Sequence, residues 1–102
     1  MIMETAEKEL WIAYLTTRRL SYRQQLINLY YPLIKYCAAK LWRRIGKGTA
    51  HEWEDLLGLG AFGLLDAVEK FSPSQGNKFT TYATTRISGA MIDGLRAYDE
   101  VP

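Results

Sequence analysis

The chain has 102 residues, 48% of them hydrophobic and 13% aromatic, which predicts one small domain (1–102) whose core needs neither disulfides nor metal. Its single cysteine, Cys37, excludes an internal disulfide and fits a reducing compartment. The formal net charge is +2. The opening residues, MIMETAEKEL, lack a basic region followed by a long apolar run, and no apolar run approaches the roughly 18 residues of a membrane span. We therefore expect a cytoplasmic protein without a secretory signal or a membrane segment.

Two helices are predicted in the first half of the chain. The leading helix falls within 1–20, and its apolar stripe consists of Leu10, Trp11, Tyr14 and Leu15. Ser21 with Gln24 is a capping-box pattern, so a second helix should begin at Ser21 and occupy 21–48. Pro32 falls inside it and predicts either a kink or two helices that meet there. The stripe of this segment consists of Leu26, Ile27, Tyr30, Leu33, Ile34, Cys37, Ala38, Leu41 and Ile45.

The second half predicts a central antiparallel pair of helices, 50–71 and 78–98, joined by a turn at 72–76 that contains proline and glycine. Thr49 with Glu52 is another capping-box pattern, so the first of the pair should begin near Ala50. Its stripe consists of Leu56, Leu59, Gly63, Leu64, Ala67, Val68 and Phe71, and that of its partner consists of Tyr82, Ala83, Ile87, Ala90, Met91 and Leu95. No run alternates as a strand does, so the predicted fold class is all-α, with four to five helices.

A glycine motif in 58–63 has two interpretations. Gly58, Gly60 and Gly63 match the dinucleotide fingerprint G-x-G-x-x-G, which would make the chain a nucleotide-binding enzyme. That motif needs a preceding strand and a strand–helix–strand unit around it, whereas here it follows a capped helix start. The sequence therefore favours the other interpretation, in which missing side chains allow another helix to approach closely.

The sequence shows no catalytic or metal-binding constellation. His51 stands alone, and Cys37 lies on an apolar stripe. The acids Glu52, Glu54 and Asp55 lie near a helix start, where negative charge is favourable. We therefore expect no enzyme, no catalytic residue, no cofactor and no metal site.

The charges are distributed unevenly along the chain. Residues 1–51 carry nine basic and three acidic side chains, and residues 52–102 carry four basic and eight acidic ones. This division indicates two different partner surfaces or, alternatively, two halves that attract each other on folding.

From about Leu26 to Pro102, several stretches match one family at its spacing. They are YPLIKY at 31–36, DLL at 55–57, GAFGLLDAVEKF at 60–71, KFTTYA at 78–83, RI at 86–87, GAMID at 89–93 and VP at 101–102. Through these stretches the chain resembles conserved region 2 of bacterial sigma factors, most closely the alternative class of flagellar and sporulation genes. The leading helix, with Trp11 and Tyr14, also resembles the short helix that precedes this region in the sporulation type.

The resemblance implies that the domain binds core RNA polymerase and recognises and melts the minus-ten promoter element. The helix 50–71 would dock on the clamp coiled coil of the largest subunit, through Asp55, Gly58, Leu59, Ala61, Phe62 and Leu65. The helix 78–98 would contact promoter DNA, and the residues that would hold the displaced non-template strand are Asn77, Lys78, Thr81, Tyr82, Thr85 and Arg86. Those that would read the paired upstream edge are Gly89, Ile92 and Asp93.

Some positions depart from the pattern of the flagellar class. Ser88, Gly94 and Glu100 stand where that class usually has arginine, glutamate and tryptophan. The changes at Ser88 and Glu100 weaken the attraction to phosphate, so a second function remains open. In that alternative the chain is a sigma-like interaction module, which is held by an anti-sigma factor or competes for polymerase without opening DNA.

Overall fold

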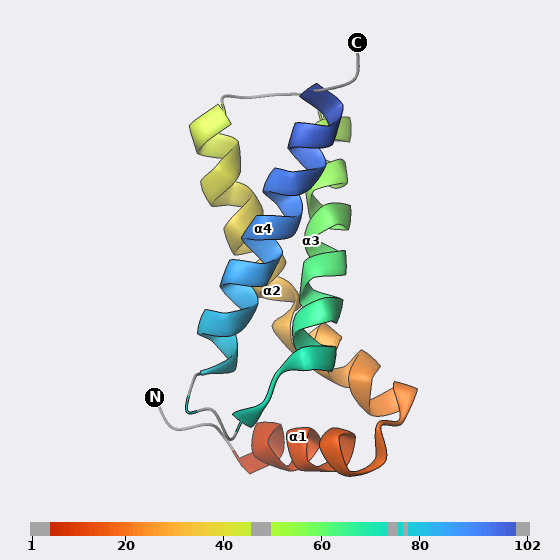
Figure 1. Ribbon diagram of the computed structural model, residues 1–102. Helices are drawn as coiled ribbons and strands as arrows, with labels where there is room; N and C mark the ends of the chain where they lie inside the picture. Colours follow the sequence, from red (N-terminus) through yellow and green to blue (C-terminus); the bar gives the residue numbers. More distant parts are fainter. Residues whose placement is uncertain (1–4, 46–49, 74–75, 77, 100–102) are drawn as a thin grey trace.

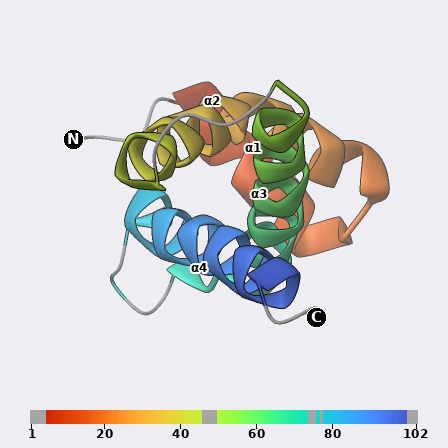
Figure 2. The same ribbon diagram turned by 90° about the horizontal axis from the view of Figure 1, so that it is seen from above.

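The computed structural model describes residues 5–45, 50–73, 76 and 78–99, and these residues form four α-helices and no strand. The helices are α1 (Thr5–Thr17), α2 (Leu20–Ile45), α3 (Ala50–Lys70) and α4 (Phe79–Asp99). Figure 1 shows α3 and α4 antiparallel and side by side, with α1 lying across the end where they are joined. Seen from above, α2, α3 and α4 surround a common centre (Figure 2). The predicted all-α class and the central antiparallel pair are confirmed.

The core lies where the apolar stripes of α2, α3 and α4 meet. Its fully buried larger side chains are Leu26, Ile34, Leu56, Leu64, Val68, Ile87 and Met91. Burying a side chain of this size contributes about 1.5–3 kcal/mol relative to leaving it in water. The predicted stripes are therefore the main source of stability, and α2 supplies the third side of the core.

The glycine motif lies inside α3, where it serves helix packing. A Cβ atom built on Gly63 would lie 2.7 Å from both the carbonyl oxygen of Arg86 and the Cα of Ile87. One built on Gly60 would lie 2.5 Å from the side chain of Met91. Since α4 can come this close only to positions without side chains, the packing interpretation is confirmed for Gly60 and Gly63. Gly58 differs, because a Cβ atom built there would have nothing within 4 Å.

Aromatic rings from α1, α2, α4 and the residue that follows α3 pack together at the end of the bundle where α1 lies. Trp11 of α1 lies 5.3 Å from Phe71 and 4.9 Å from Phe79, and Tyr30 of α2 lies 4.4 Å from Phe79, measured between ring centroids. The Trp11 indole N–H donates to the Tyr30 hydroxyl at 2.9 Å, and that hydroxyl donates to the carboxylate of Glu7. Burial raises the pKa of Tyr30 above its ordinary value, and the bond to Glu7 raises it further. This network fixes α1 over the end of the central pair.

The predicted start of α2 was wrong by one residue, and its capping box is absent. Arg18 has a positive φ of 55°, which ends α1, and the backbone oxygen of Arg19 accepts from the amide of Arg23. Helical bonding is thus under way before Ser21. The side-chain amide of Gln24 donates instead to the side chain of Asn28 at 3.0 Å, so it does not cap the helix.

Two other expectations for α2 need correction or refinement. Pro32 lies inside one continuous helix, so the alternative of two helices meeting there is wrong. Ile45 was assigned to the apolar stripe but is exposed at the end of the helix. The expected capping residue Thr49 and the end of the predicted segment 21–48 lie outside the described residues, whereas the predicted start of α3 near Ala50 is confirmed.

Candidate functional site

Four of the residues assigned to the non-template strand lie together on α4. Thr81, Tyr82, Thr85 and Arg86 line one open depression in the surface. Their positions, i, i+1, i+4 and i+5, place them in two adjacent rows along one side of a helix. The structure therefore brings together in space the aromatic ring and one of the two cations that the sequence analysis assigned to single-stranded DNA.

The ring of Tyr82 is half-buried and held between two neighbours. On one side its centroid lies 5.6 Å from that of Phe71, and the guanidinium carbon of Arg86 lies 5.2 Å from the Tyr82 centroid. This half-burial gives Tyr82 both a packed edge and an accessible part. Packing against Phe71 orders the ring before any ligand arrives.

Arg86 is tied to α3 by an ion pair. Its Nη1 lies 3.1 Å from Oδ2 of Asp66, and the other carboxylate oxygen of Asp66 lies 2.7 Å from Nζ of Lys70. The role of Asp66 could not be predicted from the sequence, because no local spacing connects two residues that are twenty positions apart. The pair orients the guanidinium beside Tyr82, but the carboxylate also offsets part of its positive charge.

The threonines give the outer face of α4 short side chains whose hydroxyl groups donate within the helix. The hydroxyl of Thr85 donates to the carbonyl oxygen of Thr81 at 3.3 Å, and that of Thr84 donates to the carbonyl oxygen of Thr80 at 2.6 Å. Since these protons are already used within the helix, the hydroxyl oxygens remain as acceptors toward solvent. Because these side chains are short, the backbone of a nucleic-acid strand can approach the helix closely.

The remaining residues assigned to DNA flank this depression along the chain. Lys78 is exposed immediately before α4, and its carbonyl oxygen accepts from the amide of Tyr82 at 3.1 Å. Farther along the helix, Ile92 and Asp93 are exposed, and Gly89 is half-buried with open space where a Cβ atom would lie. Asn77 lies outside the described residues, as does the departure at Glu100.

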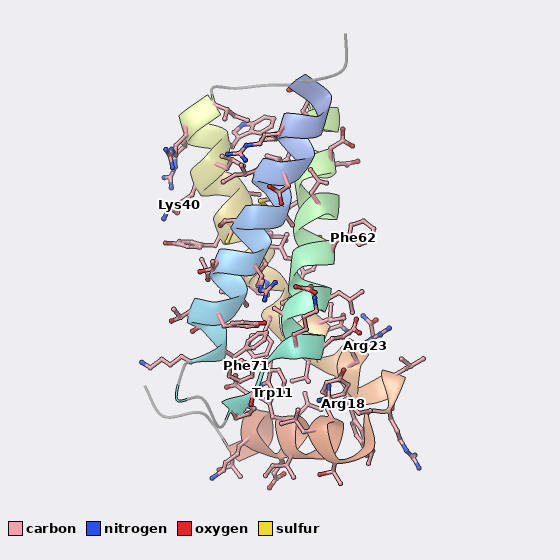
Figure 3. All side chains as sticks on the ribbon, viewed as in Figure 1. Trp11, Arg18, Arg23, Lys40, Phe62 and Phe71 are labelled. Carbon is pink, nitrogen blue, oxygen red and sulfur yellow. The ribbon has the colours of Figure 1, made fainter. Side chains whose placement is uncertain are left out.

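A different kind of surface occupies the outer side of α3. Phe62 is 74% exposed, the most exposed of the large hydrophobic side chains in the described part of the chain. Figure 3 shows it pointing away from the bundle. Asp55, Gly58 and Leu65 recur at helical spacing around it, so four of the six residues assigned to polymerase share this side. Phe62 is therefore not a core residue.

The other two residues assigned to polymerase lie at the edges of this side. Ala61 is half-buried, and Leu59 is half-buried and packs against the core. A Cβ atom on Gly94 of α4 would lie 2.5 Å from both Cδ atoms of Leu59, so the leucine occupies the space left by that glycine. Leu59 is thus partly structural, and a substitution there would mix folding with binding.

The described residues add little toward other kinds of chemistry. They contain no group of three or more histidine, cysteine or acidic side chains placed to hold a metal ion. None of the helices in this part of the chain is long and apolar enough to cross a membrane.

Comparison with known proteins identifies the family. The sigma-70 region 2 family matches residues 26–100. Over 77 residues the chain is 46% identical to the RNA polymerase sigma-D factor of Bacillus subtilis (strain 168), which covers 76% of this chain and 30% of that protein. It is 45% identical over 80 residues to the RNA polymerase sigma factor FliA of Escherichia coli (strain K12), and the match covers 78% of this chain and 33% of that protein.

A relative with lower identity is also a sigma factor that matches the same share of this chain. The sigma factor FliA of Pseudomonas aeruginosa is 41% identical over 80 residues, which cover 78% of this chain and 32% of that protein. The chain therefore spans about a third of the length of these relatives. With three quarters of its residues matched, the chain belongs to the sigma-70 region 2 family.

Proposed function

We propose that this chain is the domain of a sigma factor that binds core RNA polymerase and opens promoter DNA at the minus-ten element. In this proposal the outer side of α3 docks on the clamp coiled coil of the largest polymerase subunit. The outer face of α4 holds the displaced non-template strand, and the protein acts in the bacterial cytoplasm, where polymerase is found.

The observation that carries the proposal is the depression on α4. Its lining combines an ordered aromatic ring, Tyr82, with a cation, Arg86, and with the slim threonine face beside them. An unpaired base can stack on an aromatic ring, which is worth about 1–3 kcal/mol per base, while a cation nearby meets the phosphate. Trapping a base in this way offsets the cost of unstacking it from the duplex, about a few kcal/mol.

The α3 surface supports the same proposal from a separate observation. An exposed phenylalanine beside small and half-buried residues forms an apolar patch that a protein partner can cover. Phe62 lies on α3 and the depression lies on α4, so the proposed polymerase and DNA surfaces share no residue.

Substituting Tyr82 tests the DNA-binding part of the proposal. Tyr82→Ala should weaken binding to a labelled single strand of matched minus-ten sequence by about 1–3 kcal/mol. It should reduce the ratio of matched to scrambled binding, whereas Tyr82→Phe keeps the ring and should retain both. Binding is measured at two salt concentrations with core polymerase present, and circular dichroism checks the fold. An unchanged ratio in folded Tyr82→Ala would show that Tyr82 serves packing alone.

A second candidate function has its own support. Ser88 replaces a usual cation of the class, and Asp66 places an anion beside Arg86, so the α4 face attracts phosphate weakly. Such a chain would be a sigma-like interaction module that occupies polymerase, or an anti-sigma factor, without opening DNA. Capture of the polymerase clamp fragment combined with equal affinity for matched and scrambled strands would favour this candidate.

A further inference from the structure

The cations of α2 lie on the side of the molecule that neither proposed surface uses. The helix Leu20–Ile45 contains five basic side chains and no acidic one, whereas α3 contains five acidic side chains and one basic one. Among the ion pairs of the described residues, only that between Arg23 and Glu69, at 3.8 Å, uses a cation of α2. Attraction between the two halves of the chain therefore leaves most of this positive charge unused.

Most of the unused charge lies along one face in the second half of α2. Tyr36, Lys40, Arg43 and Arg44 are all exposed, and their spacing of i, i+4, i+7 and i+8 places them on one side of the helix. We call these four residues the basic–aromatic face. Figure 3 shows Lys40 pointing away from the bundle on the outer side of α2. The face is about 12 Å long, a length over which one strand of B-form DNA carries about three to four phosphates.

An exposed tyrosine accompanies the cations. Tyr36 is 56% exposed, and Nζ of Lys40 lies 5.8 Å from the centroid of its ring. A second such pair lies five residues earlier, where Nζ of Lys35 lies 5.7 Å from the ring of exposed Tyr31, about 140° around the helix from the first pair. Helix-dipole stabilisation explains cations in the last turn, such as Arg43 and Arg44, but it explains neither the two lysines farther back nor the exposed rings.

This face adjoins the outer face of α4. Cys37, the residue after Tyr36, is buried with its Sγ 4.0 Å from the carbonyl oxygen of Thr84. α2 therefore packs against α4 near Cys37 and Thr84, and exposed Tyr36 and Lys40 lie next to Cys37 and about one turn beyond it on α2. A strand that leaves the threonine face in this direction meets the cations of α2 next.

We infer that the basic–aromatic face of α2 is a second DNA-contacting surface, which binds the backbone of the strand held by α4. Interleaved cations and aromatic rings are the combination that binds single-stranded nucleic acid without sequence preference. An acidic protein would match the charge but gives no reason for the exposed rings. The inference rests on the proposed function, because it extends the path of the same strand.

Paired charge substitutions test this surface. Lys40→Gln with Arg44→Gln removes two cations from the face, and Lys8→Gln with Arg19→Gln removes two exposed cations from the opposite end of the molecule as a control. Binding of matched and scrambled single strands is measured over a range of salt concentrations. The α2 pair should lower the slope of log affinity against log salt by about 1.4, or about 0.7 per cation, for both strands alike. The control pair should leave the slope nearly unchanged, and Tyr36→Ala should weaken both strands equally.

Several outcomes would overturn the inference. Equal slopes for the wild type and the α2 pair, or equal losses in both pairs, would show that the face makes no local contact with DNA. An unchanged slope combined with weaker binding to core polymerase would identify an acidic protein as the partner. A wild type that binds no strand at any salt concentration would overturn this inference and the proposed function together.

Failure of the proposed function alone has a different signature. In that case the matched-to-scrambled ratio is one and does not respond to Tyr82→Ala, while the α2 pair still lowers the salt slope. Melting curves of every variant confirm that the fold is retained, as expected for exposed side chains.

Discussion

The two central helices have the same length and similar inner sides but opposite outer sides. α3 and α4 each have 21 residues, and each buries an apolar stripe against the other and against α2. On the outside, α3 presents the large exposed ring of Phe62, whereas α4 presents threonines whose hydroxyls donate to their own helix. A large apolar side chain left in water gains from being covered by a partner, while a slim polar face allows a partner's backbone to approach. The inner sides thus specify the fold, whereas the outer sides differ in a way that suits the two different partners proposed for them.

The largest effect is expected at Phe62, the centre of the α3 surface. Phe62→Asp should weaken binding to the polymerase clamp by about 2–4 kcal/mol, the range of a central aromatic contact, and should leave the melting temperature nearly unchanged. Ile12→Asp is the control, because Ile12 is also exposed but lies on α1. Binding is measured by titration with the clamp fragment. If both variants bind as the wild type does, the outer side of α3 does not contact polymerase.

The inner sides are tested by two glycines of α3. Gly63→Ala should destabilise the fold by about 1–3 kcal/mol, because the new methyl group would meet the backbone of α4. Gly58→Ala adds the same methyl group in open space and should stabilise the helix by up to about 1 kcal/mol. Denaturant unfolding measures both. Equal responses of the two variants would contradict the close approach of α4 at Gly63.

The aromatic network around Trp11 and Tyr30 should stabilise α3 and α4 without forming part of the outer side of either helix. Tyr30→Phe removes the donor to Glu7 and the acceptor of the Trp11 indole, which should cost about 1.5 kcal/mol at neutral pH. Clamp and DNA binding should remain unchanged while the variant is folded. A selective loss of one binding activity would show that this end of the molecule contributes to a surface directly.

The same tyrosine predicts how stability depends on pH. Since the pKa of Tyr30 is raised in the folded state, the folded chain keeps a proton that the unfolded chain releases above about pH 10. Its stabilising contribution is therefore complete below about pH 10 and is lost as the pH rises further. Unfolding measured between neutral and alkaline pH should show a smaller alkaline loss of stability for Tyr30→Phe than for the wild type.

The smallest effect is expected at the ion pair that joins the two helices. Asp66→Asn should cost at most about 1 kcal/mol in stability, because the pair is partly exposed. It should also strengthen binding to any single strand by about two- to five-fold, since it releases Arg86 from a competing anion. Glu9→Gln removes an exposed anion from α1 and serves as the control. Weaker DNA binding in Asp66→Asn would mean that the ion pair is needed to orient Arg86.

The helices could be predicted because their signals are local. Repeated apolar spacing and the Thr49 and Glu52 pattern located the central pair to within one or two residues, and the family resemblance predicted which positions share a surface. The start of α2 was missed because it depends on Arg18, an arginine in the left-handed region where glycine is the usual choice.

Side-chain exposure within α3 depended on distant partners. Leu59 and Phe62 are both large apolar residues on the same helix, and their spacing does not tell which one is exposed. The difference arises because Leu59 fits over Gly94, thirty-five positions away in the sequence. The ion pair between Asp66 and Arg86 was missed for the same reason.

The contact between Leu59 and Gly94 also has a consequence for how this family diversifies. The two positions share one volume, so residue size at one limits residue size at the other. Relatives with a side chain at position 94 should therefore have a smaller residue at position 59, and the two changes should be inherited together. Such paired exchange would alter the border between α3 and α4 while the fold is preserved, giving the lineage a route to change how the outer side of one helix is presented beside that of the other.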